Sequence, residues 1–232
     1  MKVSKCSISG VAGTSRRTRS TARAVANLEA RRSFRASFRC VTRAVGTPAR
    51  RKPTVFGPTK QAGRIGIDRL DFPSVDIVAD LNQGLPFLPD HSVDEIHSKS
   101  LFEHVDRLDA FLKEICRVLK PGGRNFCFVP HFSNPYYYSD YTHTKSFGLY
   151  TFYYFVEEAH QLRRKVPNFY TEVRLRVLSQ KLVFQSTFRG MNFLKKVTEC
   201  LVNQNSWLQE FYEENLCYWI PCYGIEVVFE PA

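Results

Sequence analysis

Several features that define other protein classes are missing from this sequence. No apolar run approaches the roughly 20 residues that a membrane-spanning helix needs. The seven cysteines are scattered and include no CxxC pair, which argues against a disulfide framework and against a zinc site. The six histidines add no ligand spacing, so we expect no bound metal. The cysteines indicate reduced thiols, and we expect a cytoplasmic protein.

Acidic residues are nearly absent from the first 52 residues. This segment holds 14 Lys and Arg and one acid, Glu29, whereas the remaining 180 residues hold 19 bases and 21 acids. A segment so basic and so rich in Arg, Ser, Thr and Ala cannot bury enough apolar surface to offset its ordering entropy. We therefore predict a basic tail at residues 1–52, disordered or a frayed helix, and a folded domain at residues 53–232.

Three roles for this tail stay open. Its Arg- and Ser-rich composition is typical of an organelle transit peptide, which would change the expected compartment. It could also bind phosphate groups, or be an extension without function. No apolar central region is present, which argues against a secretory signal.

From residue 53 onward, short apolar steps alternate with turns. Strands are expected at 75–81, 93–99 and 124–132, with an amphipathic helix at 107–119 that the Pro-Gly-Gly of 121–123 ends. Later strands are expected within 169–185 and 223–231, with helical residues around 191–215. A strand, a helix and a strand in succession predict a βαβ unit within an α/β fold.

The order of short motifs is more specific than any one of them. VADL, GLPF, SVDEI, LFEHV and RVLKPGG follow one another between residues 78 and 123, and PHFSNP follows at 130–135. This series resembles the class I S-adenosylmethionine-dependent methyltransferases of the type 11 kind. The resemblance implies a Rossmann-like three-layer sandwich with a mostly parallel sheet and an antiparallel C-terminal strand. It also implies a methyltransferase that uses S-adenosylmethionine as its cofactor.

The first cofactor loop of this family is altered here. Relatives typically carry L-G-C-G-P where this chain has Thr-Val-Phe-Gly-Pro at 54–58, so Gly57 is retained and Val55 replaces a glycine. Glycine permits close approach of the backbone to a ligand, which a branched side chain restricts.

By position, the resemblance places Asp68 at the ribose hydroxyls of the cofactor. A carboxylate suits this role because it can accept two hydroxyl donors. The resemblance also places Asp80 and Leu81 at the adenine, although an aspartate there is equally typical of a helix cap or an Asx-turn. Ser98 and Ser100 would border the methyl group.

The acceptor side is expected in the stretch PHFSNPYYYSDYTHTKSF at 130–147, which resembles the family segment P-H-F-S-S-P…D-P-T-H-K-R. Its polar positions are His131, Asp140 and His143, and His143 is the candidate base, paired with Asp140 or His131. Glu103 and His104 match an E-H pair of the family, which we expect to orient the neighbouring loop. The tyrosines of this stretch are expected to form a lid or part of the core.

Three functions follow from these observations. The first is a methyltransferase acting on a small-molecule or sugar-like acceptor. The second is a non-catalytic scaffold with an impaired cofactor loop. The third is an RNA-associated methyltransferase that uses the basic tail, although the nearly balanced charge of residues 53–232 argues against nucleic-acid binding by the domain itself.

Overall fold

The computed structural model describes residues 39–44, 64–71, 73 and 75–232, with side chains from residue 64 onward. Residues 37–232 form one compact unit, to which everything below refers. Its strands are β1 (Arg39–Ala44), β2 (Ile65–Asp68), β3 (Ile77–Val78), β4 (Val93–Lys99), β5 (Leu119–Pro130), β6 (Leu175–Val183) and β7 (Gly224–Pro231). Its helices are α2 (Leu108–Val118), α3 (Arg189–Val202) and α4 (Ser206–Asn215), with short 3-10 turns η1 (Leu81–Gln83), η2 (Phe102–His104), η3 (Thr151–Phe155) and η4 (Glu158–His160).

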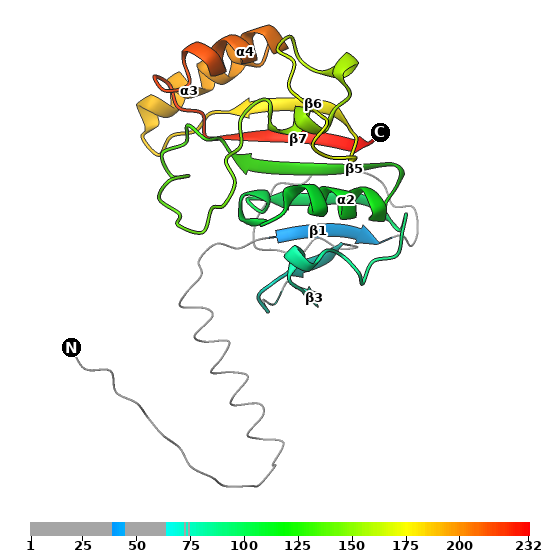
Figure 1. Cartoon of the computed structure of the whole chain (residues 1–232). Coiled ribbons are helices and arrows are strands. Elements are labelled where there is room, and N and C mark those ends of the chain that lie inside the picture. Colours follow the sequence, from blue (N-terminus) through cyan, green and yellow to red (C-terminus); the bar gives the residue numbers. More distant parts are fainter. Residues whose placement is uncertain (1–38, 45–63, 72, 74) are drawn as a thin grey trace, which may run out of the picture. The chain divides into compact units, whose positions relative to one another are not determined.

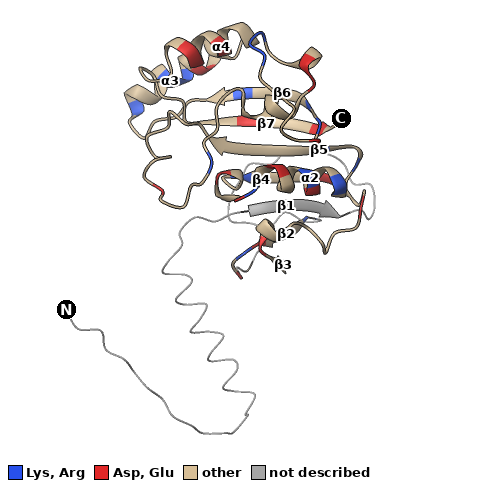
Figure 2. Ribbon diagram, in the orientation of Figure 1, with Lys and Arg blue, Asp and Glu red and all other residues tan. Residues whose placement is uncertain are grey.

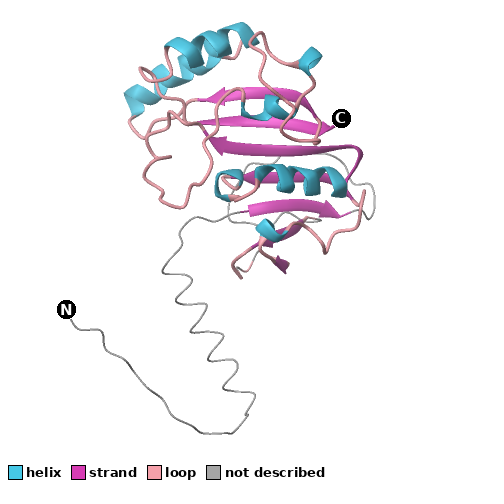
Figure 3. Ribbon diagram, in the orientation of Figure 1, coloured by secondary structure: helices cyan, strands magenta, loops and turns pink. Residues whose placement is uncertain are grey.

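The described strands form one seven-stranded sheet in the order β3-β2-β1-β4-β5-β7-β6 (Figures 1 and 3). β2 pairs parallel with β3, and β4 pairs parallel with β5. β1 is antiparallel to both of its neighbours, and so is β7. Five of the seven strands therefore run in one direction. The α/β fold and the reversed C-terminal strand are confirmed. The sheet itself is mixed and not mostly parallel, because four of its six described pairings are antiparallel.

The second reversed strand, β1, was not predicted. Residues Arg39–Ala44 lie inside the segment that the sequence analysis placed in the basic tail, yet they pair with β2 on one side and β4 on the other. The sequence of this strand, RCVTRA, contains the β-branched pair Val41 and Thr42, which favours an extended backbone. The sheet therefore begins before residue 53. The other residues of the predicted tail lie outside the described part of the chain.

The unit β4–α2–β5 follows the prediction closely. β4 spans the predicted residues, and α2 is one residue shorter than predicted at each end. Its apolar face buries Phe111, Leu112, Ile115 and Val118 against the sheet, because these residues recur at helical spacing. In Figure 1, α2 lies across one face of the sheet.

The Pro-Gly-Gly turn lies within β5 and not before it. The pairing with β4 passes from Val93–Leu119 directly to Glu95–Arg124, so the turn is an irregularity that bulges out of the ladder. Gly122 has a φ of 75°, a left-handed conformation that favours glycine. A Cβ on Gly123 would lie 2.9 Å from the carbonyl oxygen of Lys120. Both glycines are therefore required by the turn.

The C-terminal part of the sheet carries the largest aromatic core. β7 lies between β5 and β6, and its Phe229 is fully buried, with its ring centre 5.8 Å from that of Phe152. At the start of β7, a Cβ on Gly224 would overlap the ring of Phe128. Only glycine allows the two strands to pair here without displacing that ring.

The helices α3 and α4 lie beside β6 and differ in charge (Figure 2). α3 carries Arg189, Lys195 and Lys196 against one acid, whereas α4 carries three glutamates. The side chain of Asn203, between the two helices, accepts a hydrogen bond from the amide of Leu182 and donates one to its carbonyl oxygen. Within the described ranges, no helix is long and apolar enough to cross a membrane.

Candidate functional site

The strands β2, β4 and β5 end at the same edge of the sheet. β2 and β4 both run antiparallel to β1, which lies between them, and β5 is parallel to β4. In open α/β sheets, ligands bind at the carboxyl ends of the parallel strands. The predicted residues that lie at this edge or directly after it are Asp68, Ser98, Ser100 and His131.

Asp68 ends β2 and is almost fully buried, with 1% of its surface exposed. Its Oδ1 accepts a hydrogen bond of 2.9 Å from the amide of Leu70, and its carbonyl oxygen accepts one from Ala79. These contacts fix the carboxylate at the point where the chain leaves the sheet. The ribose contact stays a prediction, and Gly57 lies outside the described residues.

Asp80 caps the turn η1. The sequence analysis gave two alternatives for this residue, a cap or an adenine contact, and the cap is observed. Its Oδ1 accepts a hydrogen bond of 3.1 Å from the amide of Asn82. The side chain of Asn82 in turn accepts one of 2.9 Å from the amide of Asp106, which links η1 to the start of α2. Leu81 packs into the core with 7% exposed. The turn is thus firmly placed, and an adenine contact stays a prediction.

At the end of β4, two serines have unusual surroundings. The hydroxyl of Ser98 is buried and has no hydrogen-bond partner within the described part of the chain. Ser100 has a φ of 50°, a conformation that non-glycine residues rarely adopt and that occurs preferentially at functional sites. Its amide donates to the carbonyl oxygen of Phe128 at 2.9 Å, which holds the turn against β5. A buried, unsatisfied hydroxyl at this edge fits a ligand contact.

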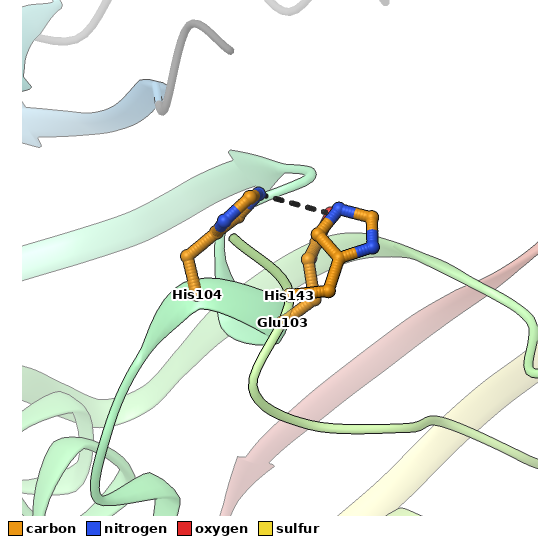
Figure 4. A group of neighbouring side chains, drawn as sticks. All are labelled: Glu103, His104 and His143. Atoms are coloured by element: carbon orange, nitrogen blue, oxygen red, sulfur yellow. Dashed lines mark ion pairs between the residues drawn. The ribbon is translucent and has the colours of Figure 1, made fainter. Parts of the chain in front are cut away.

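The turn η2 carries Glu103 and His104, and the loop after β5 brings His143 to them (Figure 4). One ligand-type atom from each of the three side chains lies within 4.8 Å of the others. The loop is held there by its backbone, because the amides of Thr144 and Lys145 donate to the carbonyl oxygen of Glu103 at 2.7 and 3.2 Å. A stretch that is distant in sequence is thereby fixed against η2.

The hydrogen bonds determine which ring nitrogen of each histidine carries the proton. The hydroxyl of Thr142 donates to Asp140 at 2.5 Å, so it accepts from Nδ1 of His104 at 3.0 Å. The Nδ1 of His143 donates to the carbonyl oxygen of Tyr137 at 2.9 Å. In the neutral form of either ring the lone pair is therefore on Nε2. The Nε2 of His143 lies 3.7 Å from a carboxylate oxygen of Asp140.

Burial sets the charges of this cluster. Burial, with a smaller contribution from nearby His143, lowers the pKa of His104 to about 4, so His104 is neutral at neutral pH. Burial raises the pKa of Glu103 to about 8, and hydrogen-bond donors, including the hydroxyl of Ser100, offset only part of that rise. Burial also acts to raise the pKa of Asp140, but hydrogen bonds from Thr142 outweigh it and bring that pKa below its usual value.

His131 makes its contacts away from this cluster. It is fully buried, its Nδ1 accepts from the amide of Ser133 at 3.0 Å, and its Nε2 donates to Glu213 of α4 at 3.1 Å. The same carboxylate oxygen accepts from the amide of Leu149 at 2.6 Å. The structure thus brings His143 to Asp140, as one of the two predicted pairings requires, whereas the described contacts of His131 are those of a structural residue.

Sequence reasoning did not foresee that Glu103 and His104 meet His143. Both pairs, Glu103-His104 and Thr142-His143, belong to motifs that resemble one family. Their contact, however, depends on the path of the chain between them, which the motifs do not reveal. Thr142 was also missed. Its hydroxyl connects Asp140 to His104, which is a tertiary arrangement that spacing alone does not reveal.

Comparison with known proteins supports the reading of this edge. The family model described as a methyltransferase domain matches residues 57–127, which include β2, η1, β4, η2, α2 and most of β5. The resemblance inferred from the motif series is therefore confirmed for this segment. No curated protein matches the chain.

Two solved structures are similar at low identity. One is the YcgJ protein from Bacillus subtilis, with 17% identity and a TM-score of 0.38, covering 68% of this chain and 72% of that one. The other is described as a methyltransferase from an antibiotic biosynthesis pathway of Anabaena variabilis, with 14% identity and a TM-score of 0.31, covering 70% of this chain and 76% of that one. At such TM-scores the assignment depends on the family match.

Proposed function

We propose that this chain, whose residues 57–127 match a methyltransferase domain model, transfers a methyl group from S-adenosylmethionine to a small-molecule or sugar-like acceptor. The observation that carries this proposal is the family match itself, since it falls on the segment that forms the edge of the sheet where open α/β sheets bind their ligands. The buried Asp68 and the unsatisfied hydroxyl of Ser98 stand at that edge and suit a ligand rich in hydroxyl and amine donors.

When bound, S-adenosylmethionine supplies a methyl group on a sulfonium that carries its own leaving group. The protein's task is then to hold donor and acceptor in line and to exclude water. Asp68 would hold the ribose hydroxyls, Asp80 and Leu81 would lie at the adenine, and Ser98 and Ser100 would border the methyl group. Gly57 would belong to the loop around the amino-acid end.

The acceptor would lie on the side of the loop at 131–150. This loop presents Tyr136, Tyr138 and Tyr141, whose side chains are 57%, 70% and 85% exposed. Their flat faces and hydroxyls suit a polar ring such as a sugar. His143, with its lone pair on Nε2 beside Asp140, is the group placed to take the proton of an acceptor hydroxyl.

The test is calorimetric titration of S-adenosylmethionine and S-adenosylhomocysteine into the full chain. Asp68→Asn should weaken binding at least tenfold, which is about 1.4 kcal/mol, because a hydrogen bond to a charged acceptor is lost. The matched control is Asp90→Asn, an exposed acid that pairs with Arg117 before β4 begins. Its effect should be less than twofold.

Two results would contradict the proposal. Absence of binding heat from either compound with the unchanged chain would favour the alternative function, a non-catalytic scaffold. The variant Val55→Gly would then show whether the altered first cofactor loop is the cause. Equal affinities for the unchanged chain and Asp68→Asn would remove Asp68 from the cofactor site.

Two finer assignments belong to the same proposal. A reducing, cytoplasm-like compartment is supported by the free thiols of the described cysteines, among them the buried Cys127 and Cys222. For the folded body we propose no nucleic-acid partner, because acids and bases are mixed along its strands and helices (Figure 2).

A further inference from the structure

The carboxylate of Glu103 is the least satisfied polar group at this edge. Its side chain is completely buried, and beyond a loose contact with the hydroxyl of Ser100 neither oxygen accepts a hydrogen bond of normal geometry within the described residues. A buried carboxylate without partners is costly, so proteins seldom keep one unless it pairs with a cation, a proton or a ligand. Whatever satisfies Glu103 must reach it from inside the cluster, because solvent does not.

The two histidines point toward the same place with their unprotonated nitrogens. The Nε2 of His104 lies 3.9 Å from Oε1 of Glu103, along the dashed line in Figure 4. The rings of His104 and His143 lie with centres 4.6 Å apart and planes at 71°. Each ring donates from Nδ1 to an oxygen of the loop, to Thr142 or to Tyr137. This is how metal-binding histidines are usually held, since the bond at one nitrogen fixes the ring and directs the lone pair of the other.

We propose that Glu103, His104 and His143 bind a divalent transition-metal cation such as Zn²⁺ or Mn²⁺. Two imidazole nitrogens and one carboxylate oxygen favour such ions over Ca²⁺ and Mg²⁺, which prefer oxygen ligands. Ligand atoms about 2 Å from a tetrahedral ion lie roughly 3.3 Å apart. The atoms here lie within 4.8 Å of one another, so small side-chain rotations would close the site.

Three protein ligands leave at least one coordination position open, as in catalytic metal sites. Asp140 adds negative charge, since its carboxylate lies 3.7 Å from Nε2 of His143. Sequence spacing gave no sign of this site, because its ligands come from η2 and from a loop beyond the next strand.

A role in the reaction rests on the proposed function. An acceptor hydroxyl bound at the open position would have a lowered pKa and would lose its proton more readily. The lone pair of His143 would then hold the ion instead of taking that proton. The ion would activate the acceptor in place of His143, and the released proton would pass to the carboxylate of Asp140 beside the cluster.

The experiment is calorimetric titration of Zn²⁺, Mn²⁺ and Mg²⁺ into the full untagged chain after chelator treatment, without S-adenosylmethionine. One equivalent of Zn²⁺ or Mn²⁺ should bind with micromolar or tighter affinity, and Mg²⁺ more weakly. Glu103→Gln removes the carboxyl group that would lose its proton to bind the ion, and His143→Asn removes the Nε2 lone pair while keeping a donor for Tyr137. Each should weaken binding at least a hundredfold. Their thermal unfolding without metal confirms that they fold.

The matched control is Glu95→Gln. Glu95 also pairs with a histidine, His97, at 3.2 Å in β4, but among the described residues no third ligand joins them. Metal affinity unchanged in this variant and lost in the other two supports the site. Absence of binding to the unchanged chain, or equal affinities in all variants, would overturn it. Because the readout is metal binding alone, the result does not depend on whether the cofactor binds.

Discussion

The two halves of the sheet are held together very differently. On one side of β1 lie β2 and β3, which share only two paired positions. On the other side, β6 and β7 share eight, and β5 and β7 share six. The first half offers few backbone hydrogen bonds and the second offers many, so local opening should be easier in the first.

This asymmetry matters for function because the candidate cofactor residues lie in both halves, whereas the Glu103–His143 cluster lies in the long half alone. Asp68 and Asp80 lie at or after the ends of the short strands, Ser98 and Ser100 at the end of β4, and Glu103 and His143 after β4 and β5. The part of the chain around Asp68 and Asp80 is therefore expected to gain order when a ligand binds, whereas the Glu103–His143 cluster is already fixed by its loop. A binding site that is fixed in advance costs less entropy to fill.

The most drastic way to break this comparison is to remove β1, which joins the two halves. A chain of residues 53–232 lacks it, and β2 would lose its pairing with the rest of the sheet. We expect this chain to lose cooperative unfolding and to aggregate, whereas residues 37–232 should unfold like the full chain. Thermal unfolding followed by circular dichroism, with size-exclusion chromatography, measures this. Identical melting of the two truncated chains would show that β1 is dispensable.

A second prediction compares one core residue from each half. Phe229→Ala in β7 removes a fully buried ring and should destabilise the protein by about 3–5 kcal/mol, from lost burial and a cavity. Ile77→Ala in β3 removes a partly exposed side chain and should cost about 1 kcal/mol. Urea unfolding at equilibrium gives both values. Similar losses would mean that the short half is as tightly packed as the long one.

A third prediction, with a smaller effect, tests how closely the long half of the sheet is packed. It compares a glycine of β7 with a glycine of the neighbouring helix α3. Gly224→Ala would push a methyl group into the ring of Phe128 and should cost about 1–3 kcal/mol. Gly190→Ala in α3 meets no atom within 4 Å and should stabilise the protein by about 0.5–1 kcal/mol through helix propensity. Opposite signs in urea unfolding are expected. A neutral Gly224→Ala would mean that the ring moves aside at little cost.

The same asymmetry explains what could be read from the sequence. β4 and α2 were predicted almost to the residue because their apolar periodicity is clear and the Pro-Gly-Gly follows. β1 was missed because its six residues lie among arginines and serines, and only its partners on both sides make it a strand. The periodicity of apolar residues identifies an element such as α2 from its own sequence. It does not identify a strand such as β1, which is recognised only from its pairing with strands on both sides.

The candidate site shows the same division. The motif series located Asp68, Ser98 and Ser100 at one edge, because the end of a strand is a local feature. The roles of His131 and His143 could not be separated in this way. One bonds to α4 and the other lies beside η2, and both relations join residues that are far apart in the chain.

The hydrogen bonds from His131 and Leu149 to Glu213 have a consequence for how the sequence of the loop at 131–150 can change. One carboxylate oxygen holds both ends of this loop, and Gly148 has no side chain to interfere, since a Cβ there would lie 2.9 Å from the other oxygen. With its ends clamped, the loop adds only about 0.6 kcal/mol of closure entropy for each doubling of length. The exposed residues between the clamped ends that lie outside the segment 140–145 held against η2 can therefore be exchanged or inserted, while the sheet beneath keeps its geometry.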